Sequence, residues 1–129
     1  MKKILFLSLC LFAFLSCQKD DFFERFGPEV LFYQYDDVET ADFISITLPA
    51  GTSSYTVKAR VSAPNKLAQI DIYRNDSPVR SITDFSQEVK ETEYFLSEEV
   101  TNITAVTKIK VIATDKNGKK YEKTFTINV

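Results

Sequence analysis

The chain has 129 residues, of which 44% are hydrophobic and 26% are charged, with 16 Lys and Arg against 18 Asp and Glu. These values are those of one ordinary folded domain, so composition excludes wholesale disorder and a coiled coil. The sequence contains no histidine, which removes the commonest general base and with it Ser-His-Asp catalysis, Cys-His catalysis and histidine-containing zinc sites. The net charge of −2, without a long basic run, argues against nucleic acid as a partner.

The N-terminus has the layout of a secretory signal. Two lysines precede an apolar run over residues 4–15, and Ser16 and Cys17 follow it. The run is too short to cross a bilayer, which needs roughly 20 apolar residues, so a transmembrane helix is the weaker interpretation. Leu15-Ser16-Cys17 resembles the lipobox of bacterial lipoproteins. The resemblance implies that residues 1–16 are removed and that Cys17 carries the lipid that binds the membrane. The alternative is a soluble exported protein with a free thiol.

The residues after the cysteine carry a second signal. Lys19, Asp20 and Asp21 resemble the short Lys-plus-acidic motif that routes some Gram-negative lipoproteins to the outer face of the outer membrane. This resemblance implies a lipid-anchored protein that faces the cell exterior, and the alternative is a solvated acidic tether. Cys10, inside the apolar run, would be removed with the signal. The mature chain would then have no disulfide, so its stability must come from the core.

The balance of acidic and basic residues differs between two parts of the remaining chain. Residues 18–42 hold eight acidic and two basic residues, whereas residues 43–129 hold ten acidic and twelve basic residues. Six aromatic residues lie within residues 22–35, too many for a purely disordered linker. Residues 29–33 are predicted to add an edge strand. The expected organisation is a signal peptide over 1–16, an acidic, aromatic-rich tether over 17–42 and a folded domain over 43–129.

Apolar and polar residues alternate with period two after residue 43, and no convincing helical stretch is present. The pattern predicts seven strands near residues 44–48, 55–62, 68–73, 79–85, 93–97, 107–113 and 121–129. Ile44, Tyr121 and Val129 belong to the rows expected to face inward. Residues 74–78 are predicted to form a turn, and residues 98–100 a single helical turn.

Asn117-Gly118 lies between the last two predicted strands and is a strong hairpin signal, because both residue types tolerate a positive φ. Seven short strands separated by turns predict a β-sandwich. Residues 67–75 and 109–129 resemble the third strand and the closing hairpin of bacterial immunoglobulin-like domains. The resemblance implies an all-β, immunoglobulin-like sandwich of about seven antiparallel strands. Such modules recur in surface lipoproteins, including glycan-capture systems of the starch-utilisation type.

Outward positions of the predicted third strand are the first candidates for a binding site. Asp71 and Tyr73 lie on one face with Gln69, and they would lie beside Lys108 and Lys110 if the immunoglobulin strand order holds. An aromatic ring next to fixed polar groups can stack on a sugar and bind its hydroxyls. The alternative is that these residues are ordinary surface pairs of a sheet.

Two tyrosines of the tether, Tyr33 and Tyr35, are further ligand-binding candidates. Their alternative role is to dock the tether onto the sandwich.

The sequence gives weaker indications of metal binding and of catalysis. Residues 115–118 resemble part of a calcium loop, but the positions that would complete the loop hold no carboxylate, so a hairpin turn is favoured. A calcium site in the acidic tether is the remaining metal possibility; it would use Asp36, Asp37, Glu39 and Asp42. Glu98 and Glu99 are adjacent and are not expected to converge as a glycosidase pair. No metal or other cofactor and no enzyme activity are expected.

These observations favour a lipid-anchored, non-catalytic surface module for glycan or host-matrix capture. The alternative is a structural or assembly subunit that binds a larger outer-membrane complex through a sheet edge or through its aromatic tether.

Overall fold

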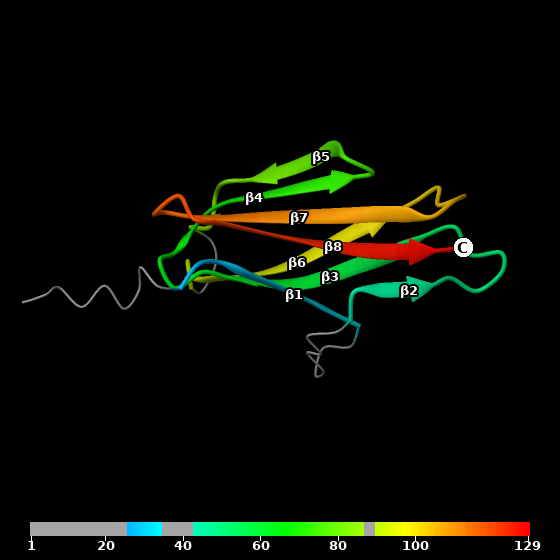
Figure 1. Cartoon of the computed structure of the whole chain (residues 1–129), viewed down its shortest axis with the longest axis horizontal. Coiled ribbons are helices and arrows are strands. Elements are labelled where there is room, and N and C mark those ends of the chain that lie inside the picture. The colour runs from blue at the N-terminus through cyan, green and yellow to red at the C-terminus, as the bar shows by residue number, and fades with distance from the viewer. Residues whose placement is uncertain (1–25, 35–42, 87–89) are drawn as a thin grey trace, which may run out of the picture.

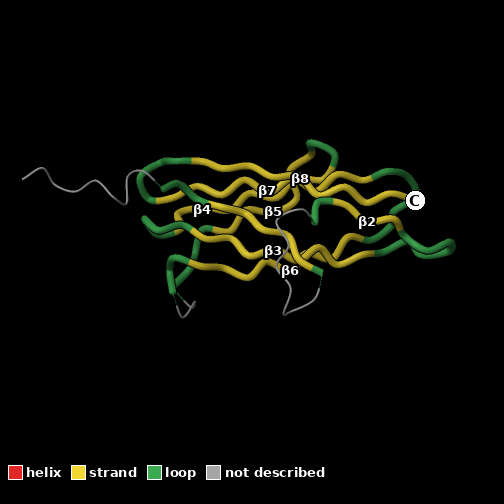
Figure 2. Tube along the Cα trace, turned by 60° about the horizontal axis from the view of Figure 1, so that its bottom comes forward, coloured by secondary structure: helices red, strands yellow, loops and turns green. Residues whose placement is uncertain are grey.

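The computed structural model describes residues 26–34, 43–86 and 90–129. These residues form β-strands and loops without a helix, which confirms the all-β class (Figures 1 and 2). Within these ranges there is accordingly no helix that is long and apolar enough to span a membrane. The strands are β1 (Glu29–Tyr33), β2 (Ser45–Thr47), β3 (Tyr55–Ser62), β4 (Leu67–Arg74), β5 (Ser77–Ile82), β6 (Glu93–Val100), β7 (Thr107–Asp115) and β8 (Lys120–Asn128).

The strands form two sheets that pack face to face as a sandwich (Figure 1). The three-stranded sheet has the order β1-β3-β6, and the five-stranded sheet has the order β2-β8-β7-β4-β5. Neighbouring strands are antiparallel except for β2 and β8, which run parallel. The described residues thus contain eight strands rather than about seven, because the predicted edge strand of the tether forms β1.

Strand β1 is an integral part of the three-stranded sheet. It pairs with β3 from Glu29 opposite Ser62 to Tyr33 opposite Lys58. Its two inward side chains, Val30 and Phe32, are fully buried. The sandwich therefore takes one strand from the acidic, aromatic segment that precedes residue 43.

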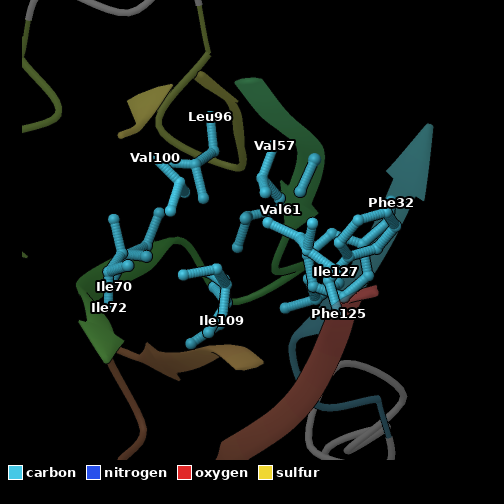
Figure 3. Close-up of a cluster of buried hydrophobic side chains, with 14 of the residues drawn as sticks. Phe32, Val57, Val61, Ile70, Ile72, Leu96, Val100, Ile109, Phe125 and Ile127 are labelled. Carbon is cyan, nitrogen blue, oxygen red and sulfur yellow. The ribbon is translucent and has the colours of Figure 1, made fainter. Parts of the chain in front are cut away.

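The core fills the space between the two sheets (Figure 3). Phe125 of β8 is at the centre of an aromatic cluster at one side of this core. Its ring centroid lies 5.2 Å from that of Phe32, 5.0 Å from that of Phe43 and 5.9 Å from that of Tyr55. These offset and tilted geometries are the favoured ones for aromatic pairs. The cluster therefore joins β1, β3 and Phe43, two residues before β2, to β8.

Three residues predicted to face the core are exposed: Ile44 by 48%, Tyr121 by 39% and Val129 by 59%. Ile44 precedes β2, and Val129 follows the last paired residue of β8. Tyr121 pairs with Ala113 next to the closing hairpin. Periodicity identifies the face on which a side chain lies, but it does not report how far the smaller facing sheet extends over that face.

The turn between β4 and β5 is shorter than predicted. Asn75 and Asp76 have φ values of 48° and 65°, so they form a two-residue turn of the kind that matches strand twist. Strand β5 consequently begins at Ser77 instead of residue 79 and ends at Ile82.

Two further predictions concern the second half of the chain. The helical turn expected over residues 98–100 is wrong, because β6 continues through Val100 in unbroken register with β3. The hairpin at Asn117-Gly118 is confirmed, but of the two residues only Gly118 has a positive φ, of 83°. The amide of Asp115 donates to the carbonyl of Lys119, so the loop has three residues and Gly118 occupies its left-handed position.

Candidate functional site

The outer face of β4 carries the two foremost candidates. Ile70 and Ile72 point into the core and are fully buried. Because side chains alternate along a strand, Asp71 and Tyr73 lie on the opposite, solvent-facing side, where both are half-buried. Strand β4 has neighbours on both sides, β5 and β7, so this face is set in the interior of the five-stranded sheet.

A hollow of about 200 Å³ joins Asp71 and Tyr73 to strand β5. The pairing of β4 with β5 shifts register between Ile72 and Tyr73. Such a bulge bends a strand locally and changes the direction of its side chains. The hollow lies at this bulge, and its other lining residues are Ile72, Pro78, Val79, Arg80 and Ser81.

The Tyr73 ring has a charged neighbour on the adjacent strand. Lys110 of β7 stands opposite Tyr73 in the register, and its Nζ lies 5.0 Å from the ring centroid. The same Nζ donates a hydrogen bond of 3.1 Å to the carboxylate of Asp76. This hydrogen bond is the main cause that raises the pKa of Lys110 above its usual value, with smaller contributions from the charges of Asp76, Glu122 and Tyr73. The ring of Tyr73, the ammonium of Lys110 and the largely exposed carboxylate of Asp76 therefore lie in a row that begins at the hollow.

Lys108 has a different role from the one expected for a neighbour of the site. Its backbone amide donates to the side-chain oxygen of Asn75, and its carbonyl accepts from the amide of Asn75, both at 2.9 Å. These contacts hold the β4–β5 turn against β7.

The carboxylate of Asp71 is oriented by its neighbour on the same face. The side-chain amide of Gln69 donates to both carboxylate oxygens, at 2.8 and 2.9 Å. Ser81 of β5 stands directly opposite Asp71 in the register. An ionised carboxylate has about four acceptor positions, so it retains capacity for donors from a ligand.

The structure does not bring the remaining candidates to this hollow. Tyr33 is on β1 and therefore belongs to the other sheet, opposite Lys58 of β3. The other predicted functional residues lie outside the described part of the chain; they are Cys17, Lys19, Asp20, Asp21 and Tyr35.

The carboxylate of Asp115, considered for calcium, serves the closing hairpin. The side chain is buried, and one oxygen accepts the backbone amides of Asn117 and Lys119 at 2.9 and 2.8 Å. Within residues 26–34, 43–86 and 90–129, no group of three or more acidic or cysteine side chains could hold a metal ion. The acidic tether residues Asp36, Asp37, Glu39 and Asp42 fall outside these ranges.

Glu98 and Glu99 point to opposite faces of β6. Glu98 faces inward with Leu96 and Val100, where its carboxylate forms a 2.8 Å ion pair with Arg80 of β5. Glu99 is exposed on the outer face. The two carboxylates therefore do not converge on one ligand.

Sequence reasoning missed the contribution of β5 to the hollow. It assigned Ser77 and Pro78 to a turn, whereas both belong to the strand. The available signal was the pair Asn75-Asp76, since these residue types tolerate the positive φ values of a two-residue hairpin. Placing the turn there would have put Pro78 opposite Tyr73, as observed.

No protein-family model matches the chain, and no curated protein matches it either.

Proposed function

We propose that this protein is a lipid-anchored, non-catalytic binding module that captures a glycan on the outer face of its five-stranded sheet. The observation that carries the proposal is the hollow at the β4–β5 bulge, where the Tyr73 ring and the Asp71 carboxylate line one cavity. An aromatic face with a few convergent polar groups is the usual composition of a sugar site.

The lining of the hollow supports recognition of a single sugar unit. Tyr73 and Pro78 stand opposite each other and supply an apolar wall for the face of a ring. Asp71 and Ser81 form the next cross-strand pair and supply an acceptor and a hydroxyl for the sugar's own hydroxyls. The volume of about 200 Å³ is below that of typical pockets for drug-sized ligands, about 300–1,000 Å³, so one residue of a longer chain fits best.

The strand order supports an immunoglobulin-like fold. In immunoglobulin terms, β1-β3-β6 corresponds to A-B-E, and β2-β8-β7-β4-β5 corresponds to A′-G-F-C-C′. The first strand of such a domain divides between the two sheets, as β1 and β2 do here. The hollow then lies on strands C and C′.

Membrane attachment in this proposal depends on Cys17, and export to the outer face depends on Lys19, Asp20 and Asp21. A shallow site for one sugar binds weakly, and many copies on one surface raise the avidity for a polymeric glycan.

Replacing Cys17 with serine should release the protein from membranes into the soluble fraction. Unchanged membrane retention would contradict the lipid anchor. Replacing Lys19, Asp20 and Asp21 with alanine should leave the protein membrane-bound but protected from protease added to intact cells.

The binding test uses the full chain in neutral detergent micelles on a broad panel of glycans. Saturable binding that Tyr73→Ala weakens at least about tenfold, equivalent to about 1.4 kcal/mol, supports the proposal. Tyr73→Phe keeps the ring and should retain most of the affinity. The matched control is Tyr121→Ala, which removes an exposed tyrosine outside the hollow. Absence of saturable binding, or equal losses for Tyr73→Ala and Tyr121→Ala, would refute the assignment.

A further inference from the structure

The four edge strands of the two sheets differ in their ability to pair with another chain. Strand β2 has three residues and β1 has five. Strand β5 contains Pro78, which has no amide proton, and its pairing is interrupted by a bulge. Strand β6 has eight residues without proline or glycine, and its pairing with β3 has no bulge. The edge of β6 is therefore the longest regular one among the described strands.

The pairing of β6 with β3 determines which of its backbone groups face outward. The amide of Ala63 donates to the carbonyl of Thr92 at 2.9 Å, just beyond the pair Ser62–Glu93. Because hydrogen-bonded and non-hydrogen-bonded pairs alternate in an antiparallel ladder, Ser62 and Glu93 form a non-hydrogen-bonded pair. The same alternation directs the N–H and C=O groups of Phe95, Ser97 and Glu99 away from β3, toward the free edge.

The side chains of this edge favour a basic, partly apolar partner. Phe95 is 57% exposed, and Glu99, on the same face beyond Ser97, is exposed without an ion pair among the described residues. Strand β6 carries Glu93, Glu98 and Glu99 and no basic residue. Arg60 lies 3.8 Å from Glu93, and Arg80 pairs with Glu98.

A second hollow, of about 80 Å³, opens between β5 and the C-terminal half of β6. Its lining is apolar at Ile72, Val79, Val100 and Ile109 and polar at Arg74, Glu98, Glu99 and Thr101. In Figure 3, Val100 lies across the core from Ile72 and Ile109, which belong to the neighbouring strands β4 and β7 of the other sheet. One water occupies about 30 Å³ of the liquid, so the hollow has room for a small aliphatic side chain. A strand added to β6 would direct every second side chain toward this space between the sheets.

We propose that the free edge of β6 accepts an extended basic segment of a partner protein as an added antiparallel strand, with one small aliphatic side chain in the hollow beside Val100. Backbone hydrogen bonds at Phe95, Ser97 and Glu99 supply the affinity. The hollow and the carboxylate of Glu99, which has no ion pair among the described residues, supply the specificity. In the antiparallel register centred on Ser97, a second copy of β6 would place Phe95 opposite Glu99 and would offer no basic side chain to that carboxylate, so a basic segment complements this edge better.

The test uses the full chain in neutral detergent micelles and three capped octapeptides. The first alternates valine and lysine, the second replaces each lysine with glutamate, and the third is the lysine peptide with N-methylated valines. Isotope-edited NMR measures the affinity and the hydrogen-exchange protection of each amide. We expect saturable binding of the lysine peptide only, with at least tenfold greater protection at Phe95, Ser97 and Glu99.

Two variants and a control accompany the peptides. Ser97→Pro removes an outward amide without removing a bond to β3, so it should abolish binding while the spectrum of the core stays folded. Glu99→Lys, on an exposed side chain, should weaken binding of the lysine peptide at least about threefold and allow the glutamate peptide to bind. Glu122→Lys makes the same charge change on β8 of the other sheet and should have no effect.

Several results would overturn the proposal. They are failure of the lysine peptide to saturate at millimolar concentration, equal binding of the glutamate peptide, and protection that maps to β1 or β5. Unchanged binding of the lysine peptide to both Ser97→Pro and Glu99→Lys would also overturn it. Self-association that protects β6 without any peptide would assign the edge to a second copy and would equally reject a basic partner.

Discussion

Replacing Phe32 with alanine tests whether β1 belongs to the cooperative unit of the sandwich. The Phe32 side chain is fully buried, and its ring lies 5.2 Å from that of Phe125. Truncating a buried phenylalanine costs about 3–5 kcal/mol, which includes the cavity that remains. The loss of the aromatic pair contributes about 0.5–1.5 kcal/mol of this. A domain of this size is stable by about 5–15 kcal/mol, so the change removes a large share of the free energy of unfolding.

The assay is urea unfolding of the chain from Gln18 onward, which leaves out the proposed signal peptide and Cys17; far-ultraviolet circular dichroism follows the loss of structure. With a slope of about 2 kcal/mol per molar urea, the midpoint should fall by about 1.5–2.5 M with no change in slope. The control is Leu31→Ala, the adjacent residue of β1, which is half-buried on the opposite face. We expect this control to cost about 1 kcal/mol or less. If Phe32→Ala costs no more than Leu31→Ala, β1 is not part of the cooperative unit and the reasoning fails.

Three further predictions concern the contacts that join the strands. Arg80→Ala removes the ion-pair partner of Glu98, whose side chain is only 13% exposed. We expect the free energy of unfolding to fall by about 1–3 kcal/mol, and adding Glu98→Gln in a double-mutant cycle should recover part of this loss. Gly118→Ala has open space for the added methyl group but a φ of 83°, so we expect a loss of about 1–2 kcal/mol by thermal unfolding, with a smaller loss for Gly118→Asn. The pKa of Glu91 is lowered chiefly by its hydrogen bond to Lys66. The stabilisation is therefore present above the ordinary pKa of 4.5 and is lost as pH falls through the lowered value, so Glu91→Gln should flatten this part of the stability profile.

The strands were predictable where local pattern and tertiary environment agree. Alternation identified Val57, Ala59 and Val61 as the buried row of β3. The prediction was wrong at residues 98–100, where a helical turn was expected after a strand over residues 93–97. Arg80, from a distant part of the chain, pairs with the inward carboxylate of Glu98 and allows the strand to continue. A single-sequence pattern contains no information about this partner.

The candidate site was predictable in part. Period two placed Asp71 and Tyr73 on one outward face, and the assumed strand order placed Lys110 beside them, where the structure has it. The hollow itself depends on the bulge between Ile72 and Tyr73. The Asn75-Asp76 turn sets the pairs Arg74–Ser77 and Tyr73–Pro78, and the same register would pair Ile72 with Val79. Ile72 instead pairs with Arg80, and no pattern within β4 indicates this shift.

The direction in which the chain enters the sandwich has a mechanical consequence. Glu29 and the β7–β8 hairpin lie at one end of the long axis, and the β4–β5 turn beside Tyr73 lies at the other (Figure 1). With the anchor proposed at Cys17 and a ligand held near Tyr73, tension runs along the strands. The β1–β3 hydrogen bonds lie across this direction, so they bear the load together in shear instead of opening one after another. Resistance to detachment would then depend on the pairing of a five-residue strand, whatever the thermodynamic stability of the remaining core.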